Sequence, residues 1–501
     1  MDTALKVLFL ASEVVPFAKT GGLADVAGAL PKALKGLGID IRVGMPRYGR
    51  IEPERFGLTN AIEPFEVPMD DVMEQVTVLQ SKMGKDVPVY FVDNPRYFNR
   101  EGIYGYPDDG ERFILYCRGM LEFVKRLGWK PDVIHCNDWH TGVVPNWLET
   151  IYRDDPFFAD TATVFTIHNL QYQGIFGHRI LEIAGIEEHG FLYNPEVCEL
   201  ANVVDLLARG IMFSDVVNTV SERYAQEIMT PEYGERLDPL LRERRDRVFG
   251  VLNGVDYEEL NPATDKYLTV NYDVNTLDER VKNKLALQKE AGLPQDPDIP
   301  LIGAVSRLAD QKGFDILGAI FDDMMSLLNV QFVLLGTGDQ HYHNMFSRFT
   351  QCYSTKAAVF LTFNAALAQK IYAGSDMFLM PSRFEPCGLG QLISLRYGSI
   401  PIVRSTGGLA DTIRDFNPRT GEGNGFVFER YHPMALYTAV VRALENFNYR
   451  DTWRKLQERG MHADYSWSTS ARKYAELYEK ARQFHRAETE GVKVAEGSPG
   501  S

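Results

Sequence analysis

The first half of the chain alternates short apolar runs with longer segments in which apolar residues recur every three or four positions. Short apolar runs are typical of buried strands, and the longer spacing predicts helices with one apolar face. Strands that alternate with helices in this order form a parallel sheet with crossover helices. The strands predicted in this half are residues 5–11, 39–45, 87–92, 133–136, 163–168 and 216–220.

The same alternation begins again in the second half, after a segment rich in Asn, Asp, Pro and Tyr that is typical of a connection. A helix is predicted within this connection, at residues 277–292. The pattern favours a second parallel sheet rather than a continuation of the first. Its predicted strands are residues 301–305, 332–335, 359–362, 377–380 and 401–403.

A chain of 501 residues is longer than one hydrophobic core usually organises, which also favours two domains. We therefore predict an α/β fold with two Rossmann-like domains, residues 1–256 and 257–486. The last predicted helix, 469–486, is expected to pack back on the N-terminal domain. The remaining residues, 487–501, are polar and end in Gly, Ser and Pro, so we predict a disordered tail.

Charge and cysteine content narrow the class of function. The chain has 53 basic and 68 acidic residues, a net charge of −15, which disfavours binding to nucleic acids and anionic membranes. Five cysteines lie far apart without a Cys-x-x-Cys pair, which favours reduced thiols in a cytoplasm, or in a plastid stroma for a plant or algal protein. No apolar run reaches 18 residues, so no membrane-spanning helix is predicted.

The hexapeptide Thr-Gly-Gly-Leu-Ala-Asp occurs twice, at residues 20–25 and 406–411. Each copy is predicted to open a helix, and helix N-termini offer free N–H groups to anions. We expect the two turns to flank one cleft between the domains. Lys19 beside the first copy fits a phosphate ligand, although a Gly-rich connection with a solvated lysine fits equally well. Ser405 stands beside the second copy, which therefore predicts a neutral phosphate or sugar cradle.

Charged residues also follow predicted strands of the second domain. Arg307 and Lys312 lie between a strand and a helix that begins near Phe314, where a guanidinium and an ammonium group suit a diphosphate. The alternative is two exposed charges on a loop. Glu385 stands between Phe384 and Pro386, and its carboxylate suits sugar hydroxyls, while the amides of residues 388–390 suit phosphate.

Polar residues end two strands of the first domain. Asp138 follows the strand 133–136, and His168 and Asn169 end the strand 163–168. Both clusters are predicted at the carboxyl edge of the sheet, where open α/β sheets bind ligands. A lone histidine is usually structural, but two polar clusters at neighbouring strand ends favour a site. No His-x-x-x-His pair indicates a metal.

Taken together, these motifs closely resemble those of bacterial glycogen synthases and plant starch synthases, over residues 7–486. The resemblance implies the GT-B architecture, with the active site in a cleft between two Rossmann-like domains. It implies transfer of glucose with retention of configuration, from ADP-glucose to the non-reducing end of an α-1,4-glucan, without a metal or organic cofactor. The motifs are residues 19–26, 138–140, 166–169, 306–308, 311–313, 382–389 and 405–409.

The resemblance also implies individual roles. Arg307 and Lys312 would stabilise the departing diphosphate, Glu385 would bind the sugar hydroxyls, and His168 would lie beneath the anomeric carbon. Phe363 resembles the aromatic residue that stacks on the donor base, or it is a core residue at a strand end. With Phe363, the residues implied in substrate binding are Lys19, Gly21, Gly22, Asp138, Asn169, Asn253, Gly388, Leu389, Gly390 and Thr406.

Two positions depart from related patterns. Gly390 stands where many bacterial members have Thr or Ile, which removes a side chain beside the diphosphate. Ile393 stands where glycosyltransferases of similar fold have a second glutamate for ribose, which favours the synthase branch.

Sucrose and trehalose-type synthases and phosphorylases fit the motifs less well. Three alternatives stay open: preference for UDP-glucose, a granule-bound starch synthase, and a catalytically silent glucan-binding homologue.

Overall fold

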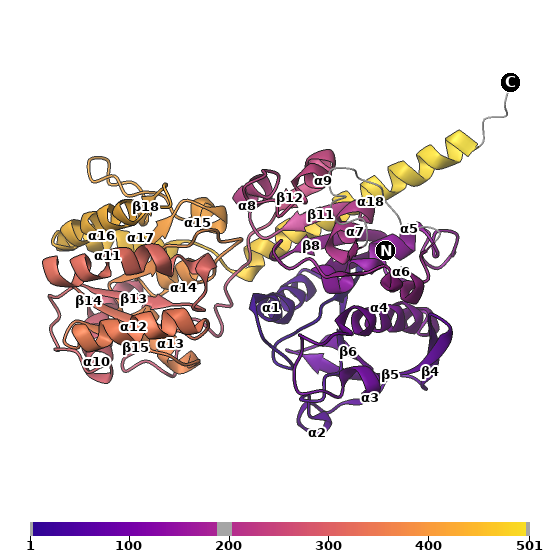
Figure 1. Cartoon of the computed structure of the whole chain (residues 1–501), viewed down its shortest axis with the longest axis horizontal. Coiled ribbons are helices and arrows are strands. Elements are labelled where there is room, and N and C mark those ends of the chain that lie inside the picture. Colours follow the sequence, from indigo (N-terminus) through magenta and orange to yellow (C-terminus); the bar gives the residue numbers. More distant parts are fainter. Residues whose placement is uncertain (1–3, 188–202, 497–501) are drawn as a thin grey trace. The chain divides into compact units, whose positions relative to one another are not determined.

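The computed structural model describes residues 4–187 and 203–496 and divides the chain into two compact units (Figure 1). Unit 1 comprises residues 1–220, 225–254 and 467–501, and unit 2 comprises residues 221–224 and 255–466. The chain therefore leaves unit 1 after Gly254 and returns to it at Trp467. Cys198, which the sequence analysis counts among the reduced thiols, lies outside the described residues.

Unit 1 is built on a sheet with seven parallel strands in the order β12-β11-β8-β7-β1-β2-β6. Beyond β6, the strands β5 and β3 continue the sheet in antiparallel pairing, and β4 also pairs with β5. A two-stranded antiparallel pair, β9 with β10, lies outside this sheet. The bounds are β1 Lys6–Leu10, β2 Asp40–Pro46, β3 Thr59–Asn60, β4 Phe65–Met69, β5 Val72–Met83, β6 Val87–Asp93, β7 Val133–Asn137, β8 Ala162–Ile167, β9 Ile175–Gly177, β10 Val203–Asp205, β11 Val216–Thr219 and β12 Val248–Gly250.

Unit 2 is built on a six-stranded parallel sheet in the order β15-β14-β13-β16-β17-β18, counted over the described residues. Strands β13, β14 and β15 follow one another in one direction, and β16, β17 and β18 follow in the other. The bounds are β13 Leu301–Val305, β14 Gln331–Leu335, β15 Ala357–Phe360, β16 Met377–Met380, β17 Ile400–Arg404 and β18 Phe426–Phe428.

Helices connect these strands as a parallel sheet requires. Short 3-10 turns accompany them, among them η1 (Trp139–Thr141), η3 (Arg245–Arg247), η4 (Val274–Glu279) and η5 (Asp310–Lys312). The α-helices are α1 Gly22–Gly36, α2 Pro53–Phe56, α3 Pro95–Phe98, α4 Asp109–Arg126, α5 Val143–Glu149, α6 Arg179–Ala184, α7 Leu206–Phe213, α8 Glu222–Glu227, α9 Asp238–Glu243, α10 Arg280–Glu290, α11 Phe314–Leu327, α12 Gln340–Cys352, α13 Ala365–Gly374, α14 Gly390–Arg396, α15 Gly407–Thr412, α16 Pro433–Phe447, α17 Arg450–His462 and α18 Trp467–Glu496.

The predicted α/β fold with two parallel sheets is confirmed, and every strand predicted from an apolar run overlaps an observed strand. The sequence analysis missed the antiparallel strands β3, β4 and β5. Their signal is weaker because β4 alternates buried with exposed residues and most of β5 is exposed or half-buried, so neither forms a continuous apolar run. It also missed the short strands β9, β10, β12 and β18.

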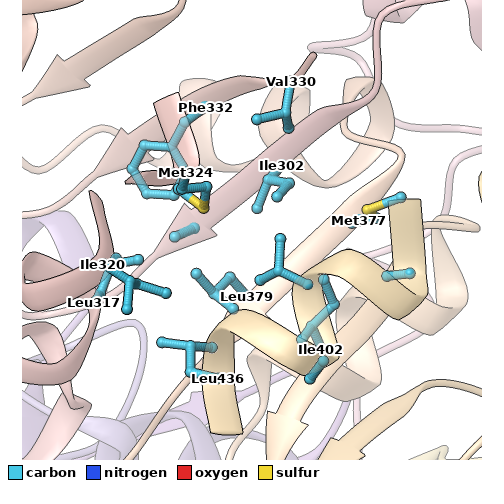
Figure 2. Packing of buried hydrophobic residues seen from close by; sticks show 14 of the residues in the cluster. Ile302, Leu317, Ile320, Met324, Val330, Phe332, Met377, Leu379, Ile402 and Leu436 are labelled. Atoms are coloured by element: carbon cyan, nitrogen blue, oxygen red, sulfur yellow. The ribbon is translucent and has the colours of Figure 1, made fainter. Parts of the chain in front are cut away.

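The sheet of unit 2 is buried on both faces, which explains why its strands are almost entirely apolar. Leu379 and Ile402 pack on one face against Leu317 of α11 and Leu436 of α16 (Figure 2). Successive strand residues point to opposite faces. Accordingly, Ile302, Phe332 and Met377 belong to this cluster, while Leu301, Val333 and Phe378 belong to the cluster on the other face.

Helix α18 packs against the sheet of unit 1, next to β8 and α1. Its two fully buried tyrosines anchor it through hydrogen bonds. The Tyr478 hydroxyl lies 2.8 Å from His135 Nδ1 on β7, and Asn218 Nδ2 on β11 donates to the Tyr474 hydroxyl at 3.1 Å. His135 Nε2 is 2.7 Å from Thr166 Oγ1. Burial lowers the pKa of His135 to about 3, so this ring is neutral.

The predicted end of this helix is wrong. Helix α18 continues to Glu496 instead of ending near Arg486, so the disordered tail predicted for 487–501 does not begin at 487. Ala, Glu, Lys and Val predominate in this segment, and its single glycine lowers helix propensity by only about 1 kcal/mol. Residues 497–501 lie outside the described part of the chain.

We expect Tyr478→Phe to lower the free energy of unfolding by about 1 to 3 kcal/mol, because it leaves a buried nitrogen of His135 without a partner. Urea unfolding followed by circular dichroism measures this change. The control is Tyr449→Phe, since Tyr449 is 67% exposed and should change stability by less than about 0.5 kcal/mol. Equal effects of the two substitutions would contradict the anchoring role of Tyr478.

Candidate active site

In each unit the strand order reverses at one point, and the predicted catalytic residues follow strands at or next to that point. In unit 1 the chain proceeds from β1 to β2 and β6 on one side, and from β7 to β8 on the other. In unit 2 the reversal lies between β13 and β16. Loops at such a point diverge at the carboxyl ends of the strands and leave room for a ligand.

The loop after β1 is organised by Glu13, which is 4% exposed. Its Oε2 accepts hydrogen bonds from the Gly21 amide at 3.1 Å, from Thr20 Oγ1 at 3.0 Å and from the Thr20 amide. A carboxylate is favoured there because the N-terminus of α1 has unpaired N–H groups and a positive dipole end. The Gly21 amide is therefore already bonded, and an incoming phosphate must use other groups of this turn.

Lys19 and Gly22 are such groups, because both are exposed. Lys19 Nζ contacts Asp25 Oδ1 at 2.6 Å, with both side chains more than one-third exposed. An ion pair this exposed contributes little and exchanges partners easily. Lys19 is therefore able to leave Asp25 for a stronger anion. The predicted contact of Lys19, Gly21 and Gly22 with the donor stays a prediction.

Asp138 follows β7 in an unusual backbone conformation, with φ +55° and ψ −178°. This region is nearly reserved for glycine and costs about 1 to 3 kcal/mol for other residues, so the surroundings must hold Asp138 in place. They do so through β8: the Asp138 amide donates to Thr166 O at 2.9 Å, and the His168 amide donates to Asp138 Oδ1 at 2.8 Å. Burial raises the pKa of Asp138 to about 7, and the Glu13 carboxylate adds to this rise.

His168 is held by Asn137 at the end of β7. Asn137 Nδ2 donates to Leu10 O at 2.9 Å, which leaves Asn137 Oδ1 as the acceptor for His168 Nε2 at 2.9 Å. His168 Nε2 therefore carries a hydrogen, and in the neutral ring Nδ1 is a lone-pair acceptor. Burial lowers the pKa of His168 to about 3, so the ring is neutral near pH 7.

The reversal point of unit 2 brings together Lys312, in the 3-10 turn after β13, and Glu385, in the loop after β16. Lys312 Nζ donates to both carboxylate oxygens, at 2.9 Å to Oε1 and 2.7 Å to Oε2. Ser382 Oγ donates to Oε2 at 2.9 Å. Glu385 is 5% exposed, so the ammonium group provides the counter-charge that a buried carboxylate requires.

Two glycines let the backbone approach this pair closely. Gly313 has φ +74°, and a Cβ there would lie 2.0 Å from Pro381 O. A Cβ on Gly408, in the second Gly-Gly turn, would lie 2.0 Å from Cys387 O, and the Gly408 amide donates to Glu385 O at 3.1 Å. This turn is buried and supports the Glu385 segment with its backbone. Only glycine allows these approaches.

The remaining predicted residues also follow strands of their own unit. Arg307 is exposed, and its guanidinium makes no hydrogen bond or ion pair with the described residues. Phe363 is 80% exposed after β15, so the alternative of a core position is wrong. Thr406 is fully buried, and Asn253 is buried with an Oδ1 that has no partner in the described structure. Gly388, Leu389, Gly390 and Asn169 are half-buried.

Unit 1 thus gathers Lys19, Asp138, His168 and their neighbours, and unit 2 gathers Arg307, Lys312, Glu385 and theirs. Glu13, Asn137 and Ser382, which orient these groups, were not predicted from the sequence. The sequence held a signal for Ser382, because this residue belongs to the motif 382–389 around Glu385. Over the described residues, no three His, Cys, Asp or Glu side chains could hold a metal ion, and no helix is long and apolar enough to cross a membrane.

Comparisons with known proteins match both units. The family model of the starch synthase catalytic domain matches residues 6–243, and that of glycosyl transferases group 1 matches residues 286–459. The glycogen synthase of Moorella thermoacetica is 50% identical over 97% of this chain and 99% of its own length. That of Thermotoga maritima is 48% identical over 95% and 99%. The chain belongs to the glycogen synthase family.

Solved structures support the same family assignment. The catalytic domain of starch synthase IV from Arabidopsis thaliana, bound to ADP and acarbose, superposes with a TM-score of 0.87 and 34% identity, over 96% of this chain and 100% of that domain. Sucrose-phosphate synthase from Thermosynechococcus elongatus, at 15% identity and a TM-score of 0.58, shares only the fold. The chain is therefore a GT-B glycosyltransferase that uses a nucleotide-sugar donor and a glucan acceptor.

The raised pKa of Asp138 gives a test of this part of the site. The ordinary pKa of a carboxyl group is near 4. Between pH 4 and about pH 7, Asp138 is therefore ionised in the unfolded chain but protonated in the folded chain, so rising pH destabilises the fold. Asparagine does not ionise. We expect the stability of Asp138→Asn, relative to the unsubstituted protein, to rise by more than about 1 kcal/mol between pH 4 and pH 7 and then to level off.

Urea unfolding at pH 4, 5.5, 7 and 8 measures this difference. Asp86→Asn is the control, because Asp86 is exposed and Lys82 lowers the pKa of its carboxyl. That variant should lack the rise. A constant difference between Asp138→Asn and the unsubstituted protein over this pH range would contradict a raised pKa at Asp138.

Proposed function

We propose that this chain transfers glucose from ADP-glucose to the non-reducing end of an α-1,4-glucan, with retention of configuration. The Lys312 and Glu385 pair at the reversal point of unit 2 supports the proposal most strongly. It places a cation and a carboxylate together at a sheet edge that suits a diphosphate and a sugar. The similarity to a starch synthase bound to ADP supports adenine as the donor base. The reaction would take place in the cytoplasm, or in the plastid stroma for a plant or algal protein, as predicted from the cysteine pattern.

The cations would stabilise the leaving group. When the bond between glucose and diphosphate breaks, negative charge grows on the phosphate oxygen, and preformed positive charge nearby lowers the barrier. Arg307 is available because its guanidinium has no partner among the described residues. Lys312 has three N–H groups and would share them between Glu385 and phosphate. The departing phosphate would itself take the proton of the acceptor hydroxyl.

Glu385 would orient glucose rather than attack it. Lys312 and Ser382 already bond its two oxygens, and the 5% exposure leaves little freedom of movement. A carboxylate held in this way is an acceptor for sugar hydroxyls with a fixed direction. Its negative charge would also favour the positive charge that develops at the anomeric carbon.

His168 would serve near the anomeric carbon as a neutral group. With a pKa of about 3 it carries no positive charge that would oppose the developing charge on the sugar. Its Nε2–H is engaged by Asn137, so Nδ1 is the atom able to accept a hydrogen bond from a sugar hydroxyl. Asp138 holds the backbone of His168 and thereby positions it.

The donor base is tested by measuring transfer of labelled glucose to glycogen from ADP-glucose and from UDP-glucose. We expect incorporation from ADP-glucose at the higher kcat/KM. A higher kcat/KM with UDP-glucose would overturn the donor assignment. No incorporation from either donor would favour the silent glucan-binding homologue, against which the paired Lys312 and Glu385 speak.

We expect Lys312→Ala and Arg307→Ala each to lower kcat at least a hundredfold, because losing one stabiliser of developing charge costs about 3 to 4 kcal/mol. Steady-state kinetics with ADP-glucose measures this loss. Lys370→Ala is the matched control, since Lys370 also bonds both oxygens of a glutamate, Glu290, but is only half-buried, on α13. This control should keep its turnover.

Lys312→Ala also leaves the buried Glu385 carboxylate without its cation, which could weaken the fold. Urea unfolding of Lys312→Ala therefore accompanies the kinetics. If the variant is folded under the assay conditions and still loses turnover, the loss is catalytic. Near-normal turnover of folded Arg307→Ala and Lys312→Ala would contradict the phosphate assignment.

A further inference from the structure

Arg404 is a buried residue whose guanidinium reaches the segment that carries Glu385. It is the last residue of β17 and is 8% exposed. Its Nη1 donates a hydrogen bond to Arg383 O, and its Nε donates to Glu429 O at 3.2 Å. Strand β17 lies between β16 and β18 in the sheet, so this one side chain contacts the segments that follow both neighbouring strands.

The backbone of the segment after β16 is bonded at three successive carbonyls. The carbonyls are those of residues 383–385, and each accepts a hydrogen bond from a different element. The donors are Arg404 Nη1 from β17, Gln311 Nε2 from η5 at 3.3 Å and the Gly408 amide from α15 at 3.1 Å, in that order. Carbonyls outside a helix or a sheet need such partners. The backbone that carries Glu385 is therefore fixed in direction by these bonds.

The side chain of Arg383 is bonded as well. Arg383 Nη2 donates to Asp315 Oδ2 at 3.1 Å, and the Tyr431 hydroxyl donates to Asp315 Oδ1. The guanidinium groups of Arg383 and Arg404 lie 4.6 Å and 5.5 Å from the centre of the Tyr431 ring. Cations are attracted to the electron-rich face of an aromatic ring. Tyr431 therefore helps to keep the two arginines in this arrangement.

A guanidinium is suited to these contacts because it is planar and donates in several fixed directions, whereas the ammonium group of lysine is a point charge on a flexible stem. A lysine at this position would keep the charge but not both bonds in these directions. We propose that Arg404 is a positioning residue, which fixes the direction of the Glu385 side chain through the backbone of residues 383–385. This inference rests on the proposed function, in which Glu385 orients glucose.

The proposal predicts that binding of glucose and binding of the diphosphate respond differently to a change at Arg404. Arg307 and Lys312 follow β13, so the binding of ADP should not depend on Arg404. A small displacement of Glu385 would misdirect the sugar ring, and small errors of orientation lower the rate steeply.

Calorimetry and steady-state kinetics on Arg404→Lys test this difference. We expect one ADP bound per chain, with a Kd within threefold of that of the unsubstituted protein. The Kd of ADP-glucose, measured without acceptor, should rise at least threefold, and kcat should fall at least tenfold. Unchanged ADP stoichiometry means that the variant is folded, so the lost turnover is not a loss of active molecules.

The matched control is Arg442→Lys. Arg442 is also an arginine of unit 2 whose guanidinium bonds a backbone carbonyl, that of Phe416 at 3.4 Å, and it contacts Asp415 at 2.8 Å. This control should keep kcat and both Kd values. An unchanged kcat in Arg404→Lys, or equal losses of affinity for ADP and ADP-glucose, would overturn the proposal.

If Arg404→Lys does not fold, Arg404→Gln takes its place, because glutamine leaves no buried charge without its bonds. The same measurements on that variant, with the same criteria, then decide the proposal.

Hydrogen exchange of the full chain without ligand tests the positioning role apart from the proposed function. We expect the amides of residues 383–389 to exchange at least threefold faster in Arg404→Lys and at unchanged rates in Arg442→Lys. Unchanged exchange in Arg404→Lys would contradict the positioning role. If the unsubstituted protein transfers no glucose from any donor, the proposed function fails, but the exchange experiment still decides whether Arg404 fixes the backbone that carries Glu385.

Discussion

The parallel pairing of β13 with β16 is the constraint on which the candidate site of unit 2 depends. It brings together Lys312 and Glu385, which are 73 residues apart in the chain, and Lys312 Nζ then bonds both carboxylate oxygens. The pair forms only if two loops approach closely, which Gly313 and Gly408 allow. Ser382 fixes the carboxylate further. Removing any of these contacts would leave a buried charge with fewer partners.

The candidate site residues of unit 1 differ from those of unit 2 in their charge. At the carboxyl ends of β7 and β8 the two main polar groups of unit 1 are half-buried: His168 is neutral, and burial raises the pKa of Asp138 to about 7. The carboxylate of Glu13 is held by the N-terminus of α1. Under the proposed function this division would assist transfer, because cations near the diphosphate assist departure while an added cation near the sugar ring would oppose it.

Much of the fold follows from the sequence for a physical reason. A strand buried on both faces must be apolar throughout, so each strand of unit 2 except the short edge strand β18 could be located from its apolar run. Strands β3, β4 and β5 could not be located in that way because they alternate or lie exposed at an edge. The end of α18 was misjudged because its polar residues were taken as a sign of disorder, although Ala, Glu and Lys also favour helix.

The site divides in the same way. Lys312 and Glu385 could be found because they stand beside Gly and Pro after apolar strands. Their mutual contact could not, since it depends on strand order. Asn137, which fixes the tautomer of His168, and Glu13, which bonds the first Gly-Gly turn, act through hydrogen bonds between loops that no local pattern records. The second Gly-Gly turn resembles the first in sequence, yet it is buried and supports the Glu385 segment through a backbone hydrogen bond from Gly408 to Glu385 O.

The central claim is that Glu385 is a fixed acceptor for sugar hydroxyls and neither a covalent nucleophile nor an acid. A nucleotide diphosphate departs as a weakly basic anion, so it requires positive charge more than a proton. Mass spectrometry of the protein after reaction with a fluorinated glucose donor tests this claim most directly. If Glu385 is only an acceptor, it stays unmodified at every time point. A stable glucosyl adduct on Glu385 would contradict it and establish a double displacement.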